Sequence, residues 1–127
     1  MRLLAIIWLL MFSSLLFAEE AEINREEIRG VVKEHLKDIR VCYEAGLQRD
    51  SKLQGKVVMD WGVDGKGKVT KANANKQKTT LKDEKVLNCI TESLQSWSFP
   101  ATPSGNTMSV SYPFFFSNKN PLTESKK

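Results

Sequence analysis

The chain from Cys89 to Pro100 reads CITESLQSWSFP, and it begins as a helix that ends at a defined stop. Apolar residues recur at helical spacing through this stretch and just before it, so they share one face of a helix. These residues are Val86, Cys89, Ile90, Leu94 and Trp97. Pro100 cannot continue a helix, and it favours an extended conformation at Phe99. The stretch therefore predicts a helix from about Lys82 or Asp83 to Ser96 that closes on two aromatic residues.

Those two aromatic residues, Trp97 and Phe99, follow an amphipathic helix directly. We interpret them as structural anchors in the core, with ligand contacts as the alternative. Trp61 belongs to the same class, because it occupies an inward position of a predicted strand.

Three segments read as strands. Gly55 to Val63 alternates apolar and polar residues and includes Trp61, and the turn residues Asp64-Gly65-Lys66-Gly67 follow it. Val69 to Ala74 then completes a hairpin with weaker alternation. In the last segment, Met108 to Phe116, apolar residues alternate strictly, and Pro113 places part of this strand at a sheet edge or a bulge because it lacks an amide hydrogen.

One further helix precedes the strands. Apolar residues from Ile28 to Tyr43 share one face, and Asn24 with Glu27 fits a capping box, so a helix is expected from about Arg25 to Gln48. The element order is then α-β-β-α-β. The expected fold is a small α+β domain over residues 24–116, in which two helices pack on a three-stranded antiparallel sheet. The polar residues 117–127 are expected to be a disordered tail.

The first residues resemble a targeting segment. Arg2 precedes an apolar run from Leu3 to Phe17, and the small residue Ala18 follows. The run is 15 residues long, which is shorter than the roughly 17–25 residues that a membrane-spanning helix needs. We expect a signal peptide at 1–18 and a periplasmic domain. An uncleaved anchor is the alternative, and it would place the protein at the inner membrane.

Two cysteines, Cys42 and Cys89, lie on the apolar faces of the two predicted helices. In an exported domain of this size they predict a disulfide, and two buried free thiols are the alternative. Two cysteines and one histidine are too few for a closed structural zinc site. No metal and no cofactor are expected.

The sequence offers little for catalysis. The single histidine, His35, sits beside an apolar helix face, where a packing role is expected rather than a catalytic one. No nucleophile motif or phosphate loop is present, and Asp60 and Asp64 are too few and wrongly spaced for a calcium loop. The net charge of +4 is spread along the chain and does not indicate nucleic-acid binding. We therefore expect neither an enzyme nor a small-molecule substrate.

A sheet edge is the feature that remains. Edges present backbone groups that can accept an extended peptide as an added strand. The last strand is the candidate, and its residues on the face opposite the core would contact a partner. These residues are Ser109, Ser111, Pro113 and Phe115.

Several motifs in order resemble the TonB C-terminal-like domain, and within it the AgmX/PglI branch first associated with gliding motility. The motifs are CYE at Cys42, GKVV at Gly55, DGKGKV at Asp64, CI at Cys89, WSFP at Trp97 and YPFFF at Tyr112. The resemblance covers about Ile28 to Phe116. It implies a periplasmic α/β domain with a cysteine pair and no enzymatic activity, whose TonB member binds an extended segment of a transporter by strand addition.

The chain departs from TonB in one respect. TonB carries a membrane anchor and a long proline-rich spacer, whereas only Glu19 to Ile23 separate the apolar run from the first helix here. We therefore expect a non-catalytic protein- or peptide-binding domain in an envelope assembly. The alternatives are an anchored component of an energy-transducing or gliding-motility system and a self-associating structural domain.

Overall fold

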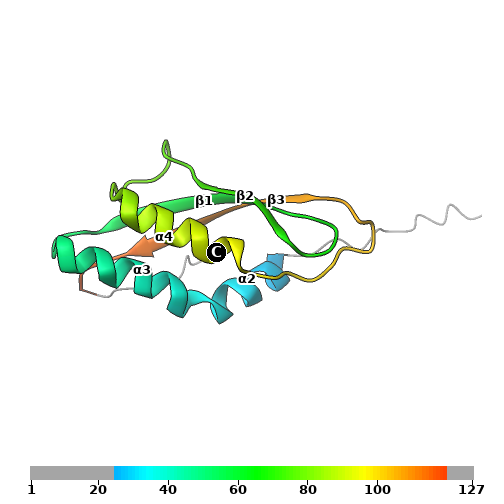
Figure 1. Cartoon of the computed structure of the whole chain (residues 1–127), viewed down its shortest axis with the longest axis horizontal. Helices are drawn as coiled ribbons and strands as arrows, with labels where there is room; N and C mark the ends of the chain where they lie inside the picture. The colour runs from blue at the N-terminus through cyan, green and yellow to red at the C-terminus, as the bar shows by residue number, and fades with distance from the viewer. Residues whose placement is uncertain (1–24, 120–127) are drawn as a thin grey trace, which may run out of the picture.

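The computed structural model describes residues 25–119, which form three helices and one sheet (Figure 1). The elements are α2 (Arg25–Glu34), α3 (Leu36–Arg49), β1 (Gly55–Val63), β2 (Val69–Ala74), α4 (Glu84–Gln95) and β3 (Met108–Phe116). The expected signal segment 1–18, the cap at Asn24 and most of the expected tail 117–127 lie outside the described residues.

The sheet is antiparallel throughout, with β1 in the centre, β2 on one side and β3 on the other. The three strands have the bounds that the alternation predicted, and the α+β architecture is confirmed. Figure 1 shows the helices gathered on one face of the sheet. That inner face carries the core, because the inward residues of the central strand are almost fully buried. They are Val57, Met59, Trp61 and Val63.

The hairpin turn between β1 and β2 requires a glycine at one position. Gly67 has a φ of 88°, and a Cβ atom there would lie 1.9 Å from the carbonyl oxygen of Phe99. The amide of Phe99 donates to the carbonyl of Gly67 over 2.9 Å, so the segment after α4 is tied to the hairpin. This contact holds the exit of α4 against the sheet.

The first helix differs from the prediction, because the segment expected to be one helix from Arg25 to Gln48 is two helices joined at His35. His35 has φ −107° and ψ 7°, and its amide donates to Val32 three residues back. Its ring stacks on Trp97 with centroids 4.8 Å apart. The break lets α2 and α3 follow different directions while the imidazole packs on the core.

Helices α3 and α4 are joined by a disulfide between Cys42 and Cys89, whose Cα atoms are 5.5 Å apart. The bond closes a loop with a sequence separation of 47 residues, and on the chain-entropy model such closure stabilises the fold by about 4 kcal/mol. Tyr43 adds a buried link, since its hydroxyl donates to the carbonyl of Leu53. Desolvation by burial raises the pKa of this tyrosine.

The start of α4 is fixed by Asp83. Its carboxylate accepts from the amide of Val86 as an N-cap and from Arg49 Nη2 at 2.9 Å, which links it to the end of α3. Burial by itself raises the pKa of Asp83, but the hydrogen bonds from Val86 and Arg49 and the charge of Arg49 lower it more. The pKa of this carboxyl therefore lies below its ordinary value.

Candidate partner-binding edge

The four residues predicted to contact a partner lie together on β3. Ser109, Ser111, Pro113 and Phe115 share the face of the sheet that the helices leave uncovered, which we call the outer face. The serines are exposed, Pro113 is half-buried, and Phe115 keeps 39% of its surface exposed. The intervening residues point inward, and Phe114 among them is 2% exposed. One strand thus contributes to the core with alternate side chains and to the surface with the others.

The hydrogen bonds of β1 show which way the backbone groups of β3 point. The amide of Val58 donates to Thr79 Oγ1, and its carbonyl accepts from the amide of Asn75. Both backbone groups of Val58 therefore point away from β3. Val58 is the register partner of Pro113, so Pro113 sits at a pair that exchanges no hydrogen bonds with β1. By the alternation of the ladder, Ser109 and Ser111 also direct their amides and carbonyls away from β1.

Pro113 therefore lacks its amide hydrogen on the side of β3 that faces away from β1. The pairing of β3 with β1 is unaffected, and its register runs without a shift from Gly55↔Phe116 to Val63↔Met108. Within residues 25–119 no strand pairs with the other side of β3. The geometry is that of a regular nine-residue edge strand with one missing donor.

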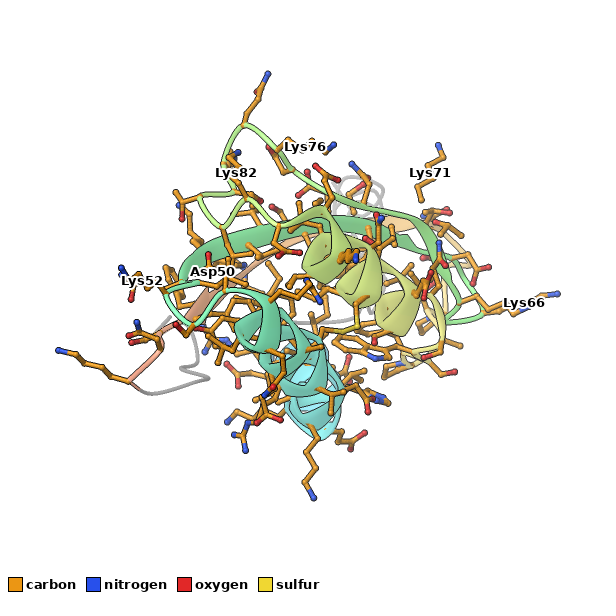
Figure 2. All side chains as sticks on the ribbon, turned by 60° about the vertical axis from the view of Figure 1, so that its left-hand side comes forward. Asp50, Lys52, Lys66, Lys71, Lys76 and Lys82 are labelled. Atoms are coloured by element: carbon orange, nitrogen blue, oxygen red, sulfur yellow. A yellow bond between two sulfur atoms is a disulfide. The ribbon has the colours of Figure 1, made fainter. Side chains whose placement is uncertain are left out.

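The opposite edge, β2, is built differently. Its register against β1 shifts between Asp60 and Gly62, so that Lys71 and Ala72 together oppose one residue of β1. Lys71 has a φ of 51°, a left-handed conformation that is unusual for a residue other than glycine. Figure 2 shows the side chain of Lys71 extending into solvent, and Lys76 and Lys82 lie along the same side of the molecule. A bulge and charged side chains are the devices that keep sheet edges from pairing.

The outer face also contains a hollow that the sequence reasoning did not identify. It is open, has a volume of about 720 Å³, and lies where β2 and β3 begin, over residues 60–62 near the end of β1. Most of its lining side chains are small or polar. They include Asp60, Gly62, Thr70, Lys71, Thr107, Ser109 and Ser111. The sequence excludes a calcium loop at Asp60, and the signal for this site is a carboxylate at an outward position of a mostly apolar strand.

The three aromatic anchors lie inside the domain. Trp61, Trp97 and Phe99 are 3%, 2% and 6% exposed. Trp61 meets Trp97 edge-on with centroids 6.5 Å apart, and it lies 6.1 Å from Phe99. His35 covers the other side of Trp97. The cluster packs on the inner face of the sheet, opposite the outer face that carries the outward residues of β3.

Among residues 25–119, no group of three side chains of the metal-binding types comes together. His35 Nδ1 lies 3.4 Å from Asp38 Oδ2 at the surface of the helix layer. Neither residue belongs to the hollow or to β3. In the same part of the chain, none of the helices combines the length and apolar character needed to cross a membrane.

Comparisons with known proteins give one structural likeness. The fold is similar to the solution structure of the C-terminal domain of TonB from Helicobacter pylori, with a TM-score of 0.42 and 18% sequence identity. The alignment covers 83% of this chain and 99% of the other. A likeness at this level does not extend to partners or activity. No family model matches the sequence, and no curated protein matches it.

Proposed function

We propose that this chain is a non-catalytic protein-binding domain that captures an extended segment of a partner as an added strand on β3. The observation that carries the proposal is the contrast between the edges: β3 is nine residues long, regular and without charged residues, whereas β2 is short, bulged and bears Lys71. An added strand is held by backbone hydrogen bonds and is selected through alternate side chains. Ser109 and Ser111 supply both kinds of contact.

The setting that we propose is the periplasm, within an envelope assembly. The support is the signal-like segment before the domain and the disulfide between Cys42 and Cys89, which suits an oxidising compartment. The motif-level resemblance to the AgmX/PglI branch belongs to the same proposal. If the N-terminal segment is retained, the domain would instead be an anchored component of an energy-transducing system, and cell fractionation separates the two.

A second candidate is self-association through the same edge. The lack of charge along Met108–Phe116 favours it, because charged edge residues are what usually prevent two copies from pairing. Light scattering across a range of concentrations measures this directly, since pairing through β3 would raise the average mass as concentration increases.

Site-specific photo-crosslinking in cells tests the main proposal. A photoreactive residue is placed in turn at Ser109, Ser111 and Phe115, and as a matched control at the exposed Lys68 on the hairpin side. The expected result is one adduct with another envelope protein at the β3 positions and none at Lys68. Adducts between copies of this chain would favour self-association. Equal adducts at all four positions, or none, would contradict capture at the β3 edge.

A further inference from the structure

We propose that Asp60 is an acidic anchor that selects a basic side chain, arginine above all, in the segment that pairs with β3. This inference rests on the proposed function and specifies the chemistry of the partner. It starts from the register of the sheet, in which Asn73, Asp60 and Ser111 form one row across β2, β1 and β3. All three point to the outer face, where the hollow lies.

The carboxylate of Asp60 lacks part of its hydrogen bonding within the described chain. Oδ2 accepts from Asn75 Nδ2 at 3.1 Å, whereas Oδ1 is buried and accepts no hydrogen bond. An ionised oxygen left in this condition costs free energy that a donor would recover. The torsion that turns a carboxylate about its Cβ–Cγ bond is soft, so either oxygen can be presented to a donor that enters the hollow.

The distance across the row selects long side chains. A residue of an added strand opposite Ser111 would lie two strand spacings, or roughly 10 Å, from the backbone of Asp60. The serine side chain is small, so it leaves a passage over β3 into the hollow. Lysine and arginine are the cationic side chains long enough to use it. Arginine fits best, because its planar fork can bind both carboxylate oxygens while the hollow's hydroxyl groups take its remaining donors.

Lys71, the cationic residue that lines the hollow, does not bind the carboxylate of Asp60. Lys71 lines the hollow, yet Asp60 forms no ion pair with it or with any other residue between 25 and 119. The left-handed backbone at Lys71 accompanies a side chain that extends away from the body of the protein in Figure 2. The negative charge of Asp60 is therefore available to a cation supplied by the partner.

The experiment is a selection of random nine-residue peptides on the full-length oxidised protein and on the Asp60→Asn variant. The enriched peptide is then synthesised with its basic residue as arginine or as citrulline, which has the same shape without the charge, and its Kd is measured. We expect wild type to prefer arginine by about tenfold or more, as for a charge-assisted hydrogen bond in place of a neutral one. We expect Asp60→Asn to abolish that preference.

Two further variants sharpen the result. Asp50→Asn removes the same charge at a distant loop, labelled in Figure 2, and should leave the preference intact. Lys71→Asn removes a competing positive charge with a residue that tolerates the left-handed backbone, and it should tighten binding of the arginine peptide.

The outcomes separate the two proposals. The enriched peptides could alternate apolar residues, lose binding in the Ser111→Pro variant that blocks β3, and show no preference for a basic residue. That result would overturn the role of Asp60 and leave strand addition standing. An arginine preference that survives in Asp60→Asn would do the same. If no peptide binds, or if blocking β3 leaves binding unchanged, capture at this edge falls and the inference falls with it.

Discussion

The two edge strands of this sheet flank the same central strand β1, yet one edge is bulged and charged and the other is regular and uncharged. Along β2 a register shift with the left-handed Lys71 interrupts the ladder, and Lys76 and Lys82 lie on the same side of the molecule. Along β3 the ladder is continuous for nine residues and includes no charge. On β3 Pro113 removes one outward hydrogen bond, but the strand has no bulge and no charged residue, which supports our proposal that this edge binds a partner.

The two edge strands also differ in the helix that each one contacts. α4 contacts β2, and α3 reaches β3 through Tyr43, whose ring stacks on Phe116 with centroids 4.7 Å apart. The disulfide and the Arg49–Asp83 pair join these two helices. The β2 edge and the β3 edge therefore rest on the same pair of joined helices, α3 and α4. Substitutions in these helices test whether the two edges depend on each other.

The largest expected effect comes from removing the disulfide. The double variant Cys42→Ser and Cys89→Ser should lower the free energy of unfolding by about 4 kcal/mol on the chain-entropy model. Urea unfolding of the oxidised wild type and of the double variant measures this difference in the free energy of unfolding. An unchanged urea midpoint would show that packing alone holds α3 to α4.

The second effect separates the edges directly. Ser111→Pro removes an amide that points away from β1, so we expect peptide affinity to fall at least thirtyfold, or about 2 kcal/mol, with little loss of stability. Ala74→Pro is the matched control, because the alternation of the ladder also points its amide away from β1, but on β2. Fluorescence titration of a bound peptide measures both variants. Equal losses from the two changes would remove the distinction between the edges.

The third effect concerns the support under β2. Asp83→Ala removes an N-cap and an ion pair with Arg49, and should cost about 1 kcal/mol at neutral pH. The pKa of Asp83 is lowered in the folded protein, so its charged form contributes stability above the unfolded pKa of about 4, and this is lost as pH falls through the folded pKa.

The difference in stability between wild type and Asp83→Ala should therefore narrow as the pH is lowered below about 4. Thermal melts over a pH series measure it, and Asp83→Asn separates the cap from the charge because asparagine can still accept from Val86. A difference that stays constant down to low pH would mean that the carboxylate's charge contributes nothing.

The smallest effect tests the bulge on β2. Lys71→Gly places a residue without a Cβ in a left-handed conformation, so the relieved strain should exceed the entropy lost by glycine, for a gain of about 0.5 kcal/mol. Lys71→Ala keeps the Cβ and should show no such gain. Thermal unfolding compares the two, and a glycine variant no more stable than the alanine variant would argue against strain at this position.

The sequence predicted most of the fold because local patterns and tertiary structure agree there. Strict alternation located β3, and the glycines after Asp64 located the hairpin. The break at His35 was missed because it depends on a contact with Trp97, which is 62 positions further along the chain and invisible to helical periodicity. The bulge at Lys71 was missed because no glycine marks it.

The candidate site was predicted in part. The outward residues of β3 follow from alternation alone, and the structure places Ser109, Ser111, Pro113 and Phe115 together on the outer face. The hollow depends on the register of three strands, which sequence does not give. The sequence shows Asp60 as a carboxylate on a mostly apolar strand, but its neighbours Ser111 and Asn75 are known only from the structure.

Pro113 also affects how readily the unfolded chain can aggregate. The segment from Met108 to Phe116 combines aromatic residues, alternation and zero charge, which is the composition of sequences that stack into cross-β fibrils. A proline inside such a segment acts as a gatekeeper, since a stack of identical strands would lose the same hydrogen bond at every layer. The native sheet loses nothing, because Pro113 has no bond to make with β1. Under our proposal a single partner strand would lose this hydrogen bond once, whereas a stack of copies of the segment would lose it at every layer.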